Sequence, residues 1–271
     1  MPLLGFRPAD RRSSRDGEVE ENVSGTTIRG LTRETLVRPI VQISLDLKSI
    51  DEALARATTA LESGADWLEV GTPLILAEGL RAVRALRQEF PGTPLIVDLK
   101  SMDGGYFEGQ MMAGAGANAV VVMGRAHDAT IERMCRAGEE YGLLVMGDDL
   151  AAADPVFEAM RLERLGVGVV SHHVGFDHRG EHPGLSPLTD LPAIVAATTV
   201  PVQAVGGLSI DDAIGCPGMG APIVVFGAPL AVDGDSGHVD LQDLPRVLTE
   251  ACRRVHEAQI HYPTAVAKPG E

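Results

Sequence analysis

Residues 94–123 read PLIVDLKSMDGGYFEGQMMAGAGANAVVVM, and this stretch contains the unit from which the fold is built. The apolar runs at 94–99 and 118–123 have the near-continuous hydrophobicity of strands that are buried on both faces. Residues 105–116 between them are helix-like and end at a glycine, a common helix terminator. A strand, a helix and a strand in this order predict two parallel strands joined by a right-handed crossover.

The same unit recurs along the chain. Strands are expected at 40–47, 66–71, 94–99, 118–123, 143–147, 167–172, 200–205 and 222–227, and helices at 50–63, 77–90, 105–116, 128–141, 154–164, 187–197, 209–215 and 240–260. Eight such units predict the α/β class and closure into a parallel eight-stranded (β/α)8 TIM barrel. An open doubly wound sheet is the alternative, but it usually has fewer strands and a glycine-rich first turn, whereas the first strand here is followed by LDLKSID.

Composition and length fit one barrel domain. The chain has 271 residues, of which 45% are hydrophobic and only 4% aromatic, and a core of small aliphatic side chains suits layered α/β packing. Residues 38–261 are expected to form the barrel. The polar residues 1–37 predict a flexible or loosely docked N-terminal extension, and residues 262–271 a frayed C-terminal tail.

Charge and cysteine content narrow the partners and the compartment. The formal net charge of −15 argues against nucleic acid and against an anionic membrane surface, while a small anionic substrate remains possible. Cys135, Cys216 and Cys252 are odd in number and widely spaced, which argues against a disulfide framework or a zinc site. With no apolar run of transmembrane length and no signal-peptide pattern, the expected location is the cytoplasm.

Polar residues gather where the predicted strands end, which is where barrel enzymes have their active sites. In strand order they are Asp46; Glu69; Asp98, Lys100 and, just beyond, Asp103; Asp148 and Asp149; His172 and His173; Gly206 and Gly207; and Gly227 and Ala228. Six of the eight strand ends carry acidic, basic or glycine-pair signals, so the sequence predicts a polar catalytic mouth.

The third and second strand ends predict a metal site. Asp98 and Lys100 point to the same side of an extended strand, so a carboxylate and an ammonium would both face the barrel axis. Glu69 ends the neighbouring strand, and two carboxylates with water and substrate oxygens commonly hold Mg²⁺ or Mn²⁺. The alternatives are a surface salt-bridge cluster, or acids that are satisfied by Lys100 alone.

The sixth and seventh strand ends predict a base and an anion site. Only one of His172 and His173 can face the axis, and that histidine could act as a general acid or base. Gly206 and Gly207, with Ser209 opening a short helix, are typical of a barrel phosphate site, although glycine pairs are usually only turns.

The strings IVQISLDL, LEVGTPLILAEGL, IVDLKSMDGGYFE, HHVGFDHRG and VQAVGGLSID resemble the 3-hexulose-6-phosphate synthases of the orotidine-5′-phosphate decarboxylase superfamily. The resemblance runs from about Pro39 to Ala231 and extends to the 3-keto-L-gulonate-6-phosphate decarboxylase branch. It implies a Mg²⁺-dependent enzyme that forms an enediolate from a sugar phosphate, most simply joining D-ribulose 5-phosphate to formaldehyde. It also implies a homodimer with active sites at the interface.

The resemblance implies a role for each site residue. These roles are Mg²⁺ ligation by Glu69 and Asp98; contact with substrate or enediolate by Asp46 and Lys100; proton abstraction by His173 or Asp148; donation across the dimer interface by Asp103; and phosphate binding by Gly206, Gly207, Gly227 and the adjoining Ala228. Asp177 matches the acid of the HxGxD pattern. Phe176 stands where the decarboxylase branch has a basic residue, which favours the synthase.

The chain also departs from the family pattern. The N-terminal extension, the His172–His173 doublet, the two acids after the fifth strand and Ala228, which stands where some relatives have an arginine, differ from it. A different phosphosugar, the decarboxylase reaction and a non-catalytic metabolite-binding barrel are therefore the alternative functions.

Overall fold

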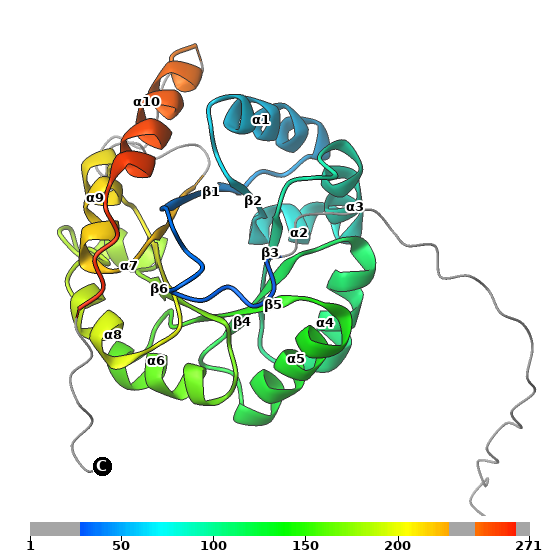
Figure 1. The fold of residues 1–271 in the computed structure, drawn as a ribbon. Helices are drawn as coiled ribbons and strands as arrows, with labels where there is room; N and C mark the ends of the chain where they lie inside the picture. Colours follow the sequence, from blue (N-terminus) through cyan, green and yellow to red (C-terminus); the bar gives the residue numbers. More distant parts are fainter. Residues whose placement is uncertain (1–27, 228–241, 264–271) are drawn as a thin grey trace, which may run out of the picture.

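A computed structural model describes residues 28–227 and 242–263 of the chain, and its centre is a closed barrel of eight parallel strands (Figure 1). The strands are β1 Ile40–Leu45, β2 Trp67–Val70, β3 Leu95–Ser101, β4 Ala119–Met123, β5 Leu144–Asp148, β6 Val169–His173, β7 Val202–Val205 and β8 Ile223–Phe226. Each strand pairs with its neighbours in chain order, and β8 pairs with β1. The predicted TIM barrel is therefore confirmed, and the open doubly wound sheet is wrong.

Helices surround the barrel and follow the strands in turn. They are α1 Ile50–Glu62, α2 Thr72–Glu78, α3 Leu80–Glu89, α4 Gly105–Ala115, α5 Asp128–Tyr141, α6 Pro155–Arg164, α7 Phe176–Glu181, α8 Leu191–Ala197, α9 Ile210–Gly215 and α10 Leu244–Glu257, with a 3-10 turn at Pro217–Met219. The single helix expected at 77–90 is two, because the chain turns at Gly79 with a φ of 59°. The short helix α7, which follows β6, was not predicted from the sequence.

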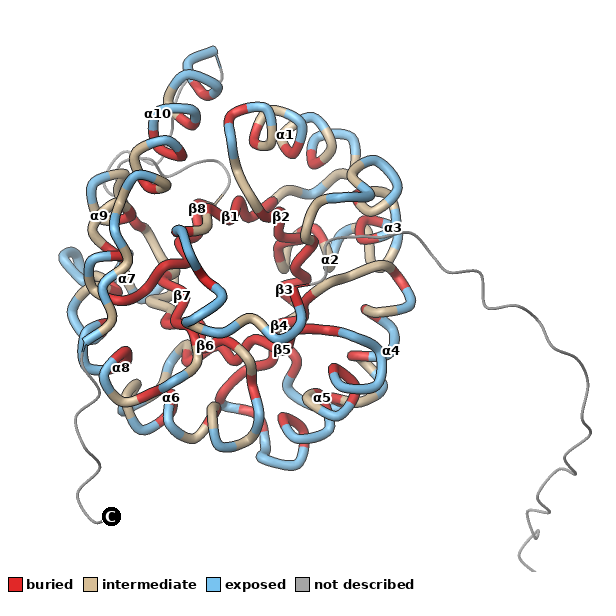
Figure 2. Tube along the Cα trace, in the orientation of Figure 1, coloured by how far each residue is buried: buried red, intermediate tan, exposed pale blue. Residues whose placement is uncertain are grey.

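Alternation along the strands separates two apolar layers. One set of strand residues faces the helices and joins their apolar faces; Val97, Val170 and Phe226 belong to it. The other set faces the barrel axis and includes Trp67 and Met146. Figure 2 shows the strands as an almost continuous buried ring, with exposed residues on the outer sides of the helices. The core therefore fixes which strand residues point into the barrel.

The segment before β1 packs across the N-terminal end of the barrel, opposite the mouth. Ile28 and Leu36 are buried against the axis-facing residues, and the segment crosses the barrel opening in Figure 1. Arg33 donates to the carbonyl oxygens of Val195 and Val200 at 3.0 and 3.1 Å, and lies over the ring of Tyr262. Part of the expected flexible extension, residues 28–37, is thus a structured cover; residues 1–27 and 264–271 lie outside the described residues.

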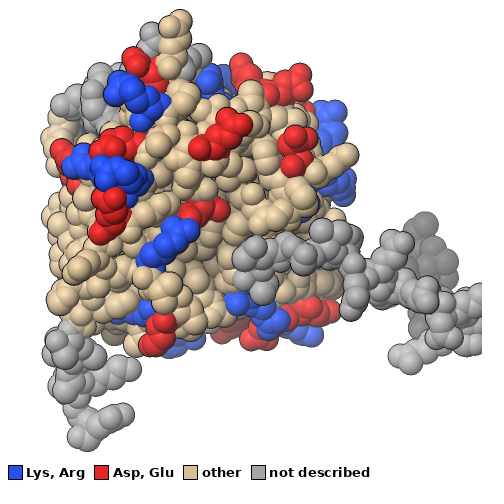
Figure 3. Space-filling model, turned by 45° about the horizontal axis from the view of Figure 1, so that its top comes forward, with Lys and Arg blue, Asp and Glu red and all other residues tan. Residues whose placement is uncertain are grey.

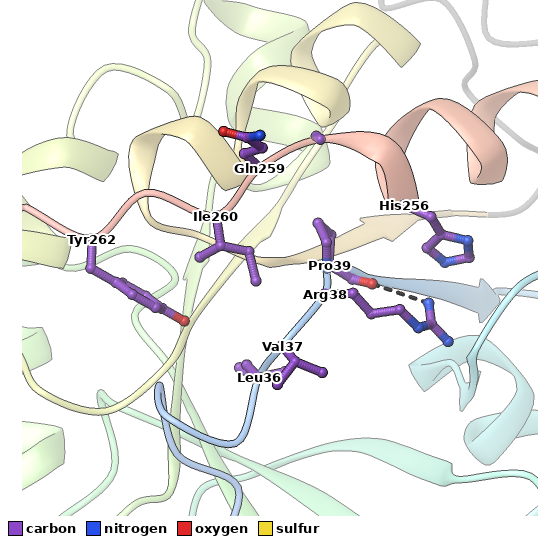
Figure 4. Close-up of a pocket in the computed structure, with 9 residues that line it drawn as sticks. Leu36, Val37, Arg38, Pro39, His256, Gln259, Ile260 and Tyr262 are labelled. Atoms are coloured by element: carbon purple, nitrogen blue, oxygen red, sulfur yellow. Dashed lines mark hydrogen bonds between the residues drawn. The ribbon is translucent and has the colours of Figure 1, made fainter.

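A hollow of about 420 Å³ lies between the residues that lead into β1 and the end of α10 with the residues that follow it (Figure 4). Its lining includes Leu36 and Pro39 on one side and His256, Ile260 and Tyr262 on the other. The residues predicted for catalysis do not line it. The hollow is therefore separate from the mouth of the barrel.

Acidic and basic side chains are mixed on the described surface. On the face in Figure 3, basic side chains are scattered and several lie beside acidic ones. On α10, for example, Arg253 pairs with Glu250 and Glu257. Within the described part of the chain, no helix has both the length and the apolar character to cross a membrane. The absence of a nucleic-acid partner and the cytoplasmic location stay predictions.

Candidate active site

Asp98 and Lys100 meet at the end of β3, as predicted, but by a different geometry. The pairing of β3 with β4 shifts between Val97 and Ser101, and Lys100 has a left-handed φ of 52°. Its ammonium pairs with the Asp98 carboxylate, which also accepts from the Thr72 hydroxyl at 2.9 Å. Burial opposes the charge on Lys100, but Asp98 and Asp148 outweigh burial and raise its pKa. Lys100 is therefore held as a cation at the mouth.

Glu69 lies inside the barrel beneath Asp98. Its carboxylate accepts from the Ser44 hydroxyl at 2.9 Å and from the Gln42 amide. Burial, followed by repulsion from Asp98 and Asp46, raises the pKa of Glu69 to about 8. The negative charge of this carboxylate is therefore only partly compensated by the protein.

A chain of polar side chains crosses the barrel beneath the mouth. Ser171 donates to Gln203 at 2.7 Å, Gln203 donates to Gln42 at 2.9 Å, and Gln42 donates to Glu69. All four side chains are buried, so each depends on the next for its hydrogen bonds. This chain was not predicted from the sequence, although Gln42 and Ser44 at alternate positions of VQIS, and Gln203 within the apolar run VQAV, were a readable signal.

Asp46 completes a group of three carboxylates. It lies over Gly71, where a Cβ would overlap its carboxylate, and a Cβ on Gly227 would lie 3.5 Å from its Oδ2. Burial, and then the charge of Asp98, raises the pKa of Asp46. Three carboxylates that repel one another are balanced by only one lysine at this position, so a further positive charge would stabilise the group.

This donor set fits a hard divalent cation. Glu69 and Asp98 supply carboxylate oxygens, and such a cation takes water and substrate oxygens for its remaining positions. Among the residues that the structure describes, no three His, Cys, Asp or Glu side chains form a complete ligand cluster. A cation held by Glu69 and Asp98 would complete its coordination with water and substrate oxygens, and metal binding at this site stays a prediction.

His173 faces the mouth and is oriented by Asp148. The Nδ1 atom of His173 lies 2.8 Å from Asp148 Oδ2, and Asp148 Oδ1 accepts from the backbone of Leu150 at 2.8 Å. Burial opposes ionisation of Asp148, but the charge and hydrogen bond of His173, together with the charge of Lys100, lower its pKa. An ionised Asp148 can only accept, so Nδ1 of His173 carries the proton and the lone pair of the neutral ring is on Nε2.

His172 lies behind this pair, toward the helix layer, because adjacent strand residues point to opposite faces. Its Nδ1 is 2.7 Å from Asp149 Oδ2, and the other oxygen of Asp149 accepts from the backbone of His173 at 2.8 Å. His172 is 3% exposed, so it is not open to the mouth. Of the two histidines, His173 is therefore the one that can reach a substrate.

The turn after β7 has the glycine conformations that were expected for a phosphate site. The start of the helix that follows is not open to a phosphate, contrary to expectation. Gly206 and Gly207 have φ values of 110° and 65°, which favour glycine. The N-cap Ser209 donates its N–H to the Asp212 carboxylate at 3.1 Å, in a capping box. The start of α9 thus already has a carboxylate partner. Ala228 lies outside the described residues.

The remaining predicted residues lie apart from this group. Asp103 is exposed and accepts from the backbone of Gly104 at 2.8 Å. Asp177 is exposed on α7. His178 and His182 are exposed too, with ring centroids 4.9 Å apart. Within one chain, Asp103 is therefore not brought into the mouth.

Comparisons with known proteins agree on one family. The family described as orotidine 5′-phosphate decarboxylase / HUMPS matches residues 39–182. The 3-hexulose-6-phosphate synthase of Mycobacterium gastri is 32% identical over 193 residues, which is 70% of this chain and 90% of the relative. The synthase of Bacillus subtilis is 31% identical over 63% of this chain and 80% of its own length.

Solved structures show the same likeness. A crystal structure of 3-hexulose-6-phosphate synthase has a TM-score of 0.70 and 31% identity, covering 78% of this chain and 99% of its own. The 3-keto-L-gulonate-6-phosphate decarboxylase of Vibrio cholerae has a TM-score of 0.66 and 27% identity, covering 80% and 99%. Both relatives have names that identify them as enzymes acting on or forming sugar phosphates.

Proposed function

Because the chain belongs to the orotidine 5′-phosphate decarboxylase / HUMPS family, we propose that it is a divalent-metal-dependent carbon–carbon lyase of the 3-hexulose-6-phosphate synthase type. Its reaction joins D-ribulose 5-phosphate to formaldehyde. The observation that carries the proposal is the convergence of Lys100, three carboxylates and the Asp148–His173 pair at one mouth. These are the groups that proton abstraction beside a carbonyl requires.

His173 is the base in this proposal, and Asp148 positions it. The Nε2 lone pair takes the proton from C1 of the ketose, and the electron pair left behind forms the enediolate. C1 then attacks the carbonyl carbon of formaldehyde, whose oxygen takes up the proton carried by Nε2 of His173, which restores the neutral base. Asp148 is less suited to be the base, since both of its oxygens already accept hydrogen bonds.

Lys100 and the carboxylates have complementary parts in this chemistry. The ammonium of Lys100 provides positive charge beside the oxygens on which negative charge develops. Glu69 and Asp98 would hold Mg²⁺ or Mn²⁺, which when bound supplies further positive charge to polarise the carbonyl. The chain from Ser171 to Glu69 fixes the orientation of the Glu69 carboxylate.

The test is consumption of formaldehyde with D-ribulose 5-phosphate and Mg²⁺, with and without EDTA. We expect turnover that EDTA abolishes and added Mg²⁺ restores. Glu69→Gln should bind Mg²⁺ more weakly by direct titration, because one charged ligand is lost. Turnover that is unchanged by EDTA would contradict the metal dependence.

The decarboxylase reaction is the second candidate, and the likeness to the Vibrio cholerae enzyme favours it. It would give the same enediolate by loss of CO2 from 3-keto-L-gulonate 6-phosphate. Release of CO2 from that compound, without consumption of formaldehyde, would replace the synthase proposal. Failure of both reactions in a protein that binds Mg²⁺ would leave a different phosphosugar or a metabolite-binding barrel.

A further inference from the structure

Arg179 lies against the double-glycine turn at the mouth. It is in α7, and a Cβ built on Gly207 would lie 2.5 Å from its guanidinium carbon. Only a glycine at position 207 leaves room for the guanidinium there. The side chain therefore rests directly on the backbone that follows β7.

Three contacts hold the guanidinium in place. Its Nε donates to the carbonyl oxygen of Val174 at 3.2 Å, and the ring of Phe176 lies 5.8 Å from Cζ on another side. The Gly207 backbone is the third contact. Among residues 28–227 and 242–263, no carboxylate forms an ion pair with Arg179. The guanidinium is thus held in a fixed position, and no ion pair in that part of the chain neutralises its charge.

The turn is next to the catalytic histidine. His173 pairs with Val205, the residue that precedes Gly206. A group bound by the guanidinium of Arg179 beside the turn would therefore be one strand away from the base. Since Asp212 already caps α9, the fixed positive charge at this turn comes from Arg179 rather than from that helix.

We infer that Arg179 binds the phosphate group of the substrate, on the glycine turn, and so positions the substrate over His173. A guanidinium presents a planar pair of donors that matches phosphate oxygens. Because Gly207 has no Cβ, the guanidinium can lie directly beside the turn that the sequence predicts for phosphate. The inference rests on the proposed function for the identity of the phosphate carrier, but the anion site itself can be tested without turnover.

The experiment compares the full-length protein with Arg179→Gln, Arg179→Lys and the control Arg84→Gln, which removes an exposed charge on α3. Inorganic phosphate is titrated calorimetrically into each protein at low ionic strength, and kcat and KM for D-ribulose 5-phosphate are measured. Arg179→Gln should weaken phosphate binding about 10-fold or more and raise KM more than it lowers kcat. Arg179→Lys should be intermediate, and the control should match the unaltered protein.

The two readouts separate the two proposals. Phosphate binding that is lost in Arg179→Gln supports the inference even if no synthase activity is found. Equal phosphate affinity in the unaltered protein and Arg179→Gln would overturn it, even with full synthase activity. Failure of the unaltered protein to bind phosphate would overturn it too.

Discussion

Lys100 combines a charge and a strained backbone in one residue. Its φ of 52° is unfavourable for a side chain with a Cβ by about 1–2 kcal/mol, while its ammonium pairs with Asp98. Such strain is common at functional sites, where surrounding structure holds it. Substitutions at this position can therefore separate stability from catalysis.

Lys100→Ala should lower kcat by roughly 10²-fold or more, because it removes charge that stabilises the enediolate. Lys100→Gly should lose as much activity, yet unfold with a free energy about 1 kcal/mol higher than Lys100→Ala, since glycine tolerates this φ. Activity assays and urea unfolding measure the two effects. A near-normal rate in Lys100→Ala would rule out its catalytic role.

Asp148 controls the protonation of His173. Burial opposes the charge on His173, but Asp148 outweighs burial and raises its pKa above the usual value. The base must be neutral, so kcat/KM should rise as pH increases through this raised pKa. In Asp148→Asn the stabilising charge is lost, so the rising limb should move to lower pH, and kcat should fall roughly 10-fold or more.

The control for this profile is Asp190→Asn, at an exposed aspartate without a side-chain cap hydrogen bond. The rise of kcat/KM with pH in Asp190→Asn should coincide with that of the unaltered protein. If Asp148→Asn leaves the limb in place, the titrating group is not His173.

The packing of α4 on α5 makes a testable contrast between two glycines of one helix. A Cβ on Gly105 would overlap the Thr130 carbonyl of α5, whereas a Cβ on the exposed Gly114 meets nothing within 4 Å. Gly105→Ala should therefore destabilise the protein by about 1–3 kcal/mol. Gly114→Ala should stabilise it by about 0.5–1 kcal/mol, because alanine favours the helix.

Thermal or urea unfolding of both variants measures this contrast. Equal effects of the two substitutions would mean that the close approach of α4 to α5 does not determine the outcome. Because neither glycine lies in the mouth, kcat should change little in Gly114→Ala.

At the level of strands and helices, the repeated strand–helix units could be predicted from the sequence, whereas single turns and contacts could not. Apolar runs recur with every unit, so all eight strands could be predicted. The left-handed turn at Lys100 could not, because alternation alone already placed Asp98 and Lys100 on one side. The contact between Arg179 and Gly207 was also hidden, since the two residues meet only in the folded chain.

At the scale of the whole molecule, the exposure of Asp103 bears on whether the protein forms a dimer. It is exposed, and Met102 and Phe107 beside it are 53% and 65% exposed. We expect that a second chain covers this region and receives Asp103 in its active site. Sedimentation should then show a dimer, and an active protein that is only monomeric would contradict this arrangement.

Mixing two inactive variants tests this donation directly. Asp103→Ala and Lys100→Ala should each be inactive as homodimers. Refolded together, they should form hybrid dimers with one complete site, giving about one quarter of full activity after random assembly. No recovery in verified hybrids would place Asp103 outside the partner's site.

The cover formed by residues 28–37 bears on how the barrel could be joined to other proteins. The chain enters the described structure at Ile28 and leaves it near Tyr262, and both residues lie at the end away from the mouth, where Arg33 of the cover lies over the ring of Tyr262. A second enzyme tethered to either of these points would start from the closed end of the barrel. Substrate could then pass between the two catalytic units without a linker crossing the entrance.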